Sequence, residues 1–130
     1  MNIPSDLKYT KADEWLRIEG NTATLGVTDY AQDQLSDVVF VEIAAAQGDE
    51  VKKGDIAATL ESVKAAADVN FPVSGTITDI NEDLSLNPEI VNSDPYGDAW
   101  MVKLSLADQK EVADLMDAAA YETYCQERSH

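Results

Sequence analysis

The feature that most constrains the fold is a series of short segments rich in β-branched and aromatic residues, separated by turns that contain glycine or proline. Such segments are typical of β-strands, and their close spacing favours a sandwich or a flattened barrel. We therefore predict a mainly β fold with peripheral helices. The expected strands span residues 15–19, 22–27, 38–43, 56–61, 66–71, 75–80 and 100–104.

The C-terminal quarter of the chain changes to the spacing of an α-helix. Four apolar residues recur three and four positions apart, behind a capping box formed by Ser105 and Asp108. This pattern predicts an amphipathic helix over about residues 106–120 that packs on the sheets. The four apolar residues are Val112, Leu115, Met116 and Ala119.

Two other segments lie outside the expected strands. Thr28 or Asp29 can cap a short helix that runs to about Leu35. Residues 81–97 are polar and include two prolines and a glycine, so we expect a long irregular connection there.

The charge balance and the hydropathy argue against two classes of function. The 130 residues carry a net charge of −16, from 25 acidic and 9 basic side chains. Nucleic-acid binding requires Lys and Arg to neutralise phosphates, so we expect no nucleic-acid partner. The acidic excess favours solubility and steering towards basic docking faces on partner proteins. The apolar runs are shorter than the ~20 residues of a membrane helix, so no membrane association is expected.

The N-terminal segment gives an expectation for location. It lacks a basic region followed by an apolar stretch, so it does not predict a secretory signal. It is also not rich in Arg and Ser, as a transit peptide would be. The expected location is the cytoplasm of a bacterium, or the mitochondrial matrix for a mature eukaryotic form.

Cysteine and histidine are too few for most self-contained catalytic sites. The sequence holds one cysteine, Cys125, and one histidine, His130 at its very end. A nucleophile activated by histidine would therefore need its base from a chain terminus. Zinc sites of the usual Cys and His kinds lack their ligands. We expect a chain that is not an enzyme and holds no metal.

Lys64 is the only basic residue between Lys53 and Lys103, and it lies between two expected strands. Its neighbours Val63 and Ala65 are not bulky enough to block an approaching enzyme. A lysine in water is mostly protonated at neutral pH, so its acylation needs an enzyme that supplies an activated acyl donor and removes the proton. By itself such a lysine is most often an ordinary solvated side chain. The surrounding sequence has to decide between this interpretation and that of a lysine acylated by an enzyme.

Short sequence blocks on both sides of Lys64 decide between the two. They are KYTK (8–11), EWLR (14–17), GVTDYAQ (26–32), VVFVE (38–42), ESVKA (61–65), PVSG (72–75), NPEIVN (87–92) and DPYG (94–97), with Asn81 and Trp100. These blocks and their order resemble the glycine cleavage system H proteins over essentially the whole chain. The block around Lys64 resembles the family's lipoylation motif.

The resemblance implies a single lipoyl-carrier domain over residues 1–130, with an N-terminal extension and the C-terminal helix. Its fold would be a barrel-sandwich hybrid, with lipoate amide-linked to Lys64 at a hairpin tip. A lipoyl-attaching enzyme would recognise the flanking Glu61, Ser62, Val63 and Ala65.

The resemblance also implies a carrier role in glycine catabolism. The aminomethyl group of glycine would be loaded by a pyridoxal-phosphate glycine decarboxylase and passed to a tetrahydrofolate-dependent aminomethyltransferase. An FAD-dependent dihydrolipoyl dehydrogenase would reoxidise the arm. A long tether suits this role because it keeps the reactive group at high effective concentration near each partner.

Members of the family are thought to shelter the loaded arm in a surface cleft, away from water. Glu14 and Asp68 match positions of this cleft, where they would pair with the cationic amine. In a chain with 25 acidic residues, the simpler interpretation is that both are ordinary surface carboxylates. The chain departs from the family at Asp13 and Gln34, which occupy positions that are often histidine. An account that relies on imidazole at the cleft is therefore in doubt here.

Two alternatives stay open. A biotinyl carrier presents a lysine on a similar hairpin, but its usual signature has methionine on both sides, where this chain has Val63 and Ala65. An H-like protein that relays lipoyl groups without serving glycine cleavage would share the same motifs. A lipoyl domain of a 2-oxoacid dehydrogenase fits less well, because such modules are shorter and are joined by linkers to catalytic domains.

Overall fold

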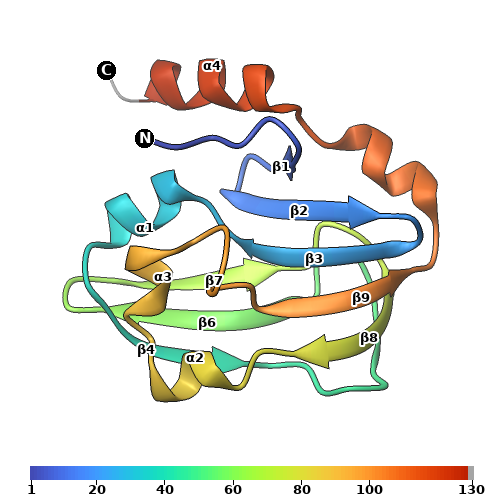
Figure 1. Cartoon of the computed structure of the whole chain (residues 1–130), viewed down its shortest axis with the longest axis horizontal. Coiled ribbons are helices and arrows are strands. Elements are labelled where there is room, and N and C mark those ends of the chain that lie inside the picture. Colours follow the sequence, from blue (N-terminus) through green and yellow to red (C-terminus); the bar gives the residue numbers. More distant parts are fainter. Residues whose placement is uncertain (129–130) are drawn as a thin grey trace.

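The computed structural model describes residues 1–128, which form two antiparallel sheets with peripheral helices (Figure 1). The smaller sheet has the order β4-β6-β7, and the larger has the order β1-β2-β3-β9-β8-β5. The smaller sheet contains β4 (Val38–Ile43), β6 (Ile56–Ser62) and β7 (Ala66–Asn70). The larger contains β1 (Lys8–Tyr9), β2 (Glu14–Glu19), β3 (Thr22–Val27), β5 (Glu50–Val51), β8 (Gly75–Ile80) and β9 (Val102–Leu106).

The prediction of a mainly β fold is confirmed. The strands at 22–27, 38–43 and 75–80 have the expected bounds, and three others differ by one residue at one end. The last strand is displaced, because β9 spans Val102–Leu106 and not residues 100–104. Its neighbours fix this position: Val102 pairs with both Leu25 and Ile80, so the strand begins where both partners are available.

One apolar core lies between the sheets and receives side chains from both. Leu25 and Leu104 come from the larger sheet, and Val41, Leu60 and Val69 from the smaller. All five are almost fully buried. Burial of apolar surface of this kind is the main stabilising contribution in a domain of this size.

The helices lie at the periphery of the two sheets (Figure 1). Helix α1 (Asp29–Leu35) is capped by Thr28, whose hydroxyl accepts a hydrogen bond from the amide of Ala31. Thr28 is one of the two caps that the sequence predicted. The stretch expected to be irregular, residues 81–97, contains two single-turn helices, α2 (Asp83–Leu86) and α3 (Ile90–Ser93). Each helix buries one apolar side chain, Leu84 in α2 and Val91 in α3. The polar composition of this stretch gave no indication of these two helices. None of the helices in the described part of the chain is long and apolar enough to cross a membrane.

The helix expected over about residues 106–120 is wrong in its bounds. That stretch holds a 3-10 helix, η1 (Gln109–Asp114), and an extended segment, and the α-helix α4 (Ala118–Arg128) begins only afterwards. Met116 interrupts the helical pattern because its backbone pairs with Tyr9, with N···O distances of 2.8 and 2.9 Å in the two directions. Asp108 does cap a helix, but it caps η1 through the amide of Lys110.

A second, aromatic cluster fastens α4 to the larger sheet. The rings of Tyr9 and Tyr121 stack with centroids 4.6 Å apart. Trp15, Tyr121 and Cys125 are completely buried in the same cluster. Figure 1 shows α4 beside the β1 edge of the larger sheet, and α4 contacts β1 there.

Gly75 tests how closely the neighbouring strands β8 and β9 of the larger sheet approach each other. A methyl group at this position would overlap the backbone carbonyl oxygen of Ser105. We expect Gly75→Ala to lower the free energy of unfolding by about 1–3 kcal/mol, the usual cost of overpacking. Chemical denaturation measures this change, with Thr76→Ala on the same strand as the control because Thr76 is exposed. Equal stability of the two variants would contradict the packing described here.

Candidate functional site

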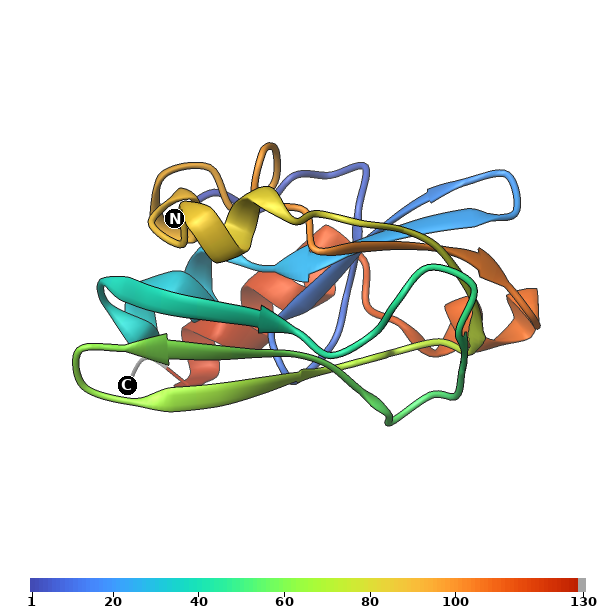
Figure 2. The same cartoon turned by 90° about the horizontal axis from the view of Figure 1, so that it is seen from below.

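Lys64 lies at the tip of the β6–β7 hairpin, which projects at one end of the molecule (Figures 1 and 2). Strand β6 ends at Ser62 and β7 begins at Ala66, so the turn leaves Lys64 exposed. Neither of the ion pairs formed within residues 1–128 involves Lys64. Its amino group is therefore open to a large partner.

The hydroxyl of Ser62 organises this turn. It accepts from the amides of Ala65, at 3.0 Å, and Lys64, at 3.3 Å, and it donates to the carbonyl oxygen of Ala65. The amide of Ser62 also donates to the Ala65 carbonyl, at 2.8 Å. The backbone on both sides of Lys64 is thus held by one side chain, whereas the lysine side chain is exposed and takes part in no ion pair in the described part of the chain.

The connection between α1 and β4 supports the tip from one side. The amide of Val63 donates to the carbonyl oxygen of Asp37, at 3.2 Å. Asn92 fixes the same connection, because its side chain donates to the Ser36 carbonyl and accepts from the Val38 amide. The start of β4 therefore lies beside the turn that carries Lys64, as Figure 2 shows.

Glu61 and Asp68, both expected near the site, lie on the solvent-facing side of the smaller sheet. Glu61 pairs in register with Ala66, and Thr59 pairs with Asp68. The Thr59 hydroxyl donates to the Asp68 carboxylate at 3.2 Å. Both carboxylates are exposed, and neither forms an ion pair within the described residues.

Glu14 occupies a different environment. It is only 3% exposed, and its carboxylate joins the start of β2 to β7. One oxygen accepts from the Asn70 amide at 2.7 Å and the other from the Thr10 hydroxyl at 3.0 Å. Burial raises the pKa of Glu14 above its usual value of 4.5, although these two hydrogen bonds lower it and only partly compensate.

Glu14 and Asp68 do not line the same hollow. Glu14 faces a cavity of about 310 Å³ whose walls include Phe71, Pro72, Leu115 and Met116, and Asp68 is not among its lining residues. Strand β7 nevertheless connects the two carboxylates, since Glu14 binds the Asn70 amide only two residues beyond Asp68. Along this strand Asp68 is the nearer of the two to the Lys64 tip.

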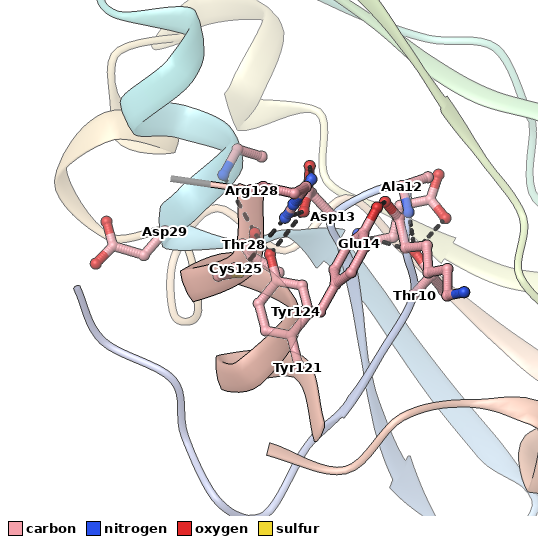
Figure 3. A network of polar contacts seen from close by, with 12 residues as sticks. Thr10, Ala12, Asp13, Glu14, Thr28, Asp29, Tyr121, Tyr124, Cys125 and Arg128 are labelled. Atoms are coloured by element: carbon pink, nitrogen blue, oxygen red, sulfur yellow. Dashed lines mark hydrogen bonds and ion pairs between the residues drawn. The ribbon is translucent and has the colours of Figure 1, made fainter. Parts of the chain in front are cut away.

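Asp13 takes part in a network that sequence reasoning did not find (Figure 3). Its carboxylate binds the Arg128 guanidinium through two contacts of 2.6 and 3.0 Å, and it accepts from the Tyr121 hydroxyl at 2.9 Å. Burial raises the pKa of Tyr121 far above the usual range, so this phenol stays protonated and donates. Asp13 itself has a φ of 68°, a left-handed conformation that aspartate tolerates better than most residues.

The network ties three distant segments together. The Tyr121 hydroxyl also contacts Thr28, the cap of α1, at 2.6 Å, and the Arg128 guanidinium lies 4.1 Å from the ring centres of both Tyr30 and Tyr124. Asp13 stands next to Glu14, so the C-terminal helix helps to hold the segment that carries the buried carboxylate. An acidic residue at position 13 gave the only signal of this arrangement in the sequence.

The second departure from the family pattern, Gln34, is exposed on α1. It lines a shallow hollow with Met1, Asp29, Tyr30 and Asp33. His130 lies outside the described residues. Within residues 1–128 no group of three or more His, Cys, Asp and Glu side chains could hold a metal ion.

Two sheets around one core, with an exposed lysine at the tip of a hairpin, define a barrel-sandwich fold of the lipoyl- and biotinyl-carrier type. The model of the family "Glycine cleavage H-protein" matches residues 7–128. The chain belongs to the glycine cleavage H-protein family.

Individual relatives agree with this assignment. The chain is 50% identical over 127 residues to a glycine cleavage system H protein of Halothermothrix orenii, with 98% of each chain covered. It is 50% identical over 118 residues to one of Thermotoga maritima, covering 91% of this chain and 94% of the relative. The crystal structure of a glycine cleavage system H protein from Mycobacterium marinum superposes with a TM-score of 0.84, at 29% identity, covering 98% of this chain and all of that one.

The raised pKa of Glu14 predicts a pH-dependent effect on stability. A carboxyl whose pKa is higher in the folded state stabilises the fold below its unfolded value near 4.5, and this contribution is lost as the pH rises through the folded pKa. Glu14→Gln cannot ionise. The free energy of unfolding of the variant should therefore increase relative to the unsubstituted chain as the pH is raised from about 4 to 7.

Chemical denaturation of both proteins at several pH values measures this difference, because the two proteins differ only at position 14. Asp68→Asn, which makes the same change from carboxyl to amide at an exposed residue, is the matched control. A Glu14→Gln difference that does not change with pH would contradict the raised pKa.

Proposed function

We propose that this chain is a lipoyl carrier of the glycine cleavage system, with lipoate in amide linkage to the Nζ atom of Lys64. The observation that carries the proposal is the exposed Lys64, which forms no ion pair within residues 1–128 and lies on a turn held by Ser62. The residues present fit the group, because the neighbouring Val63 and Ala65 are exposed and leave the amine accessible.

In this role the protein would carry the aminomethyl group of glycine on one of the two sulfur atoms that lipoate supplies, with the ring disulfide opened. It would load at a pyridoxal-phosphate glycine decarboxylase and unload at a tetrahydrofolate-dependent aminomethyltransferase, and an FAD-dependent dihydrolipoyl dehydrogenase would reoxidise it. The chain would act as a cofactor-bearing single domain without turnover of its own. The proposed location is the bacterial cytoplasm.

The chain's own residues contribute support and restraint. The β6–β7 hairpin places the attachment point away from the body of the protein, so that different enzymes can reach it. The exposed Asp68 is the first carboxylate along β7 that an arm anchored on Lys64 meets, and it can attract a cationic amine. Glu14 lies further along, and its carboxylate can still accept a hydrogen bond because each oxygen has a second lone pair.

Substitution of Lys64 tests the attachment point. Lys64→Arg keeps the positive charge, but an arginine stays protonated and is not acylated. We expect this variant to fold normally and to show no lipoyl mass increment and no support of glycine decarboxylation. The measurements are intact mass and the exchange of labelled bicarbonate into glycine with the decarboxylase, with Lys53→Arg as the control lysine.

The same measurements separate the alternatives. A biotin-sized increment on Lys64, in protein from cells that make both cofactors, would overturn the lipoyl assignment. Lipoylated protein that supports no bicarbonate exchange would favour an H-like relay. An active Lys64→Arg variant would show that the attachment point lies elsewhere.

Removal of the Ser62 hydroxyl tests whether the turn matters for modification. Ser62→Ala loses the group that fixes the amides of Lys64 and Ala65, so the tip should fray and lipoyl attachment should slow several-fold. The melting temperature should change little, because exposed hydrogen bonds contribute only about 1 kcal/mol. Ser62→Thr restores the hydroxyl and should restore the rate, which is followed by mass spectrometry over time. Attachment at an unchanged rate in Ser62→Ala would contradict this role.

A further inference from the structure

Three apolar side chains are unexpectedly exposed beside the Lys64 turn. Val39 and Phe40, consecutive residues of β4, are 53% and 44% exposed, and Val63 is 71% exposed. In a regular strand one of two consecutive side chains faces the core. We call Val39, Phe40 and Val63 the tip patch.

A β-bulge in β4 produces this exposure. Val38 pairs with Ser62, whereas Phe40 pairs with Glu61, the very next residue of β6, so Val39 is an extra residue in the ladder. Val38 and Val41 are buried on either side of the bulge. Phe40 is thereby turned to the solvent-facing side of the sheet, where its register partner Glu61 lies. In a regular strand one of these two side chains would be buried in the core. Exposing both therefore loses the stabilisation that the burial of one of them would give.

The tip patch is continuous with the modification site. Val63 adjoins Lys64, and its amide is hydrogen bonded to Asp37, two residues before Val39. Exposed carboxylates border the patch at Asp37, Glu42 and Glu61. This corner of the protein therefore offers an apolar centre with an acidic rim next to the only lysine of the hairpin.

We propose that the tip patch is the docking surface for the enzyme that attaches lipoate to Lys64. The inference rests on the proposed function, because it presumes that Lys64 receives a lipoyl group. The partner's complementary surface would be an apolar pocket bordered by Lys or Arg, which matches the acidic rim.

Reach distinguishes the attaching enzyme from the other partners. Before modification no arm exists, so this enzyme must bring its reacting atoms to Nζ itself and must cover the turn and the start of β4 beside it. Enzymes that act later work at the far end of the arm and need not touch this corner. A patch directly beside the turn therefore fits the attaching enzyme best.

The attachment step explains why close docking is needed. The enzyme deprotonates the Nζ ammonium, and the amine then attacks the carbonyl carbon of an activated lipoyl donor, such as an acyl adenylate or a carrier thioester. The N–C amide bond forms, the bond from that carbon to the activating group breaks with its electron pair leaving on that group, and Nζ releases a second proton. Each transfer requires the lysine to be held in one geometry in the enzyme's site.

The test compares Phe40→Ser with Ile56→Ser as substrates of a purified lipoyl-attaching enzyme supplied with lipoyl adenylate. Ile56 is a matched control, because it is 49% exposed and lies at the opposite end of β6 from the turn. Attachment to Lys64 is followed by intact mass. We expect Phe40→Ser to lower kcat/KM about tenfold, mainly through KM, with recovery in Phe40→Leu, and Ile56→Ser to remain within about twofold.

The outcomes separate this proposal from the proposed function. An unsubstituted chain that is not lipoylated at all would overturn the proposed function. Lipoylation of Phe40→Ser at the normal rate, or an equal loss in Ile56→Ser, would overturn the docking surface alone. Phe40→Ser that has been driven to full lipoylation should support bicarbonate exchange with the decarboxylase within about twofold of the unsubstituted chain. A comparable loss in that assay would assign the patch to the decarboxylase and overturn the proposal.

Discussion

Strand β6 pairs with β7 in a register that sets Glu61 opposite Ala66 and Thr59 opposite Asp68, and the position of Lys64 follows from this register. Because side chains alternate between the two faces of a strand, a shift by one residue would move Leu60 out of the core and Glu61 into it. The buried Leu60 and Val69 therefore fix the register, and with it the three residues of the turn. A solvent-exposed lysine is held in place by apolar burial several residues away.

The buried carboxylate of Glu14 is a second constraint, because it holds the end of strand β7 against the start of β2. A charge in this position is costly unless it is hydrogen bonded, and the Asn70 amide and the Thr10 hydroxyl satisfy it. The adjacent Asp13 is held by Arg128 and Tyr121, so helix α4 stabilises the segment that carries Glu14. Asp13, which departs from the family pattern, and Glu14, which matches it, are therefore adjacent residues of one hydrogen-bonded network that joins β7, β2 and α4.

The hairpin and its surroundings divide the work of a carrier between rigid and accessible parts. Ser62 fixes the backbone of the turn, and the bulge at Val39 makes the neighbouring surface apolar and exposed. The side chain of Lys64 is exposed and forms no ion pair within residues 1–128. In the proposed carrier role, partner enzymes would contact the body of the protein at this corner, and the chemistry would take place at the end of an arm attached to Lys64.

The sequence by itself determined most of the strands, the short helix that follows Thr28, the hairpin at Lys64 and the family. These features depend on local alternation, turn residues and short motifs, so they can be inferred without knowledge of distant contacts. The C-terminal helix was misplaced because the apolar spacing from Val112 to Ala119 comes from a 3-10 turn and an extended segment, and Met116 pairs with Tyr9. The burial of Glu14, the contact of Asp13 with Arg128 and the exposure of Phe40 were decided only by the tertiary structure. Each depends on which residues, more than twenty positions apart in the sequence, come to lie side by side, and local patterns do not carry that information.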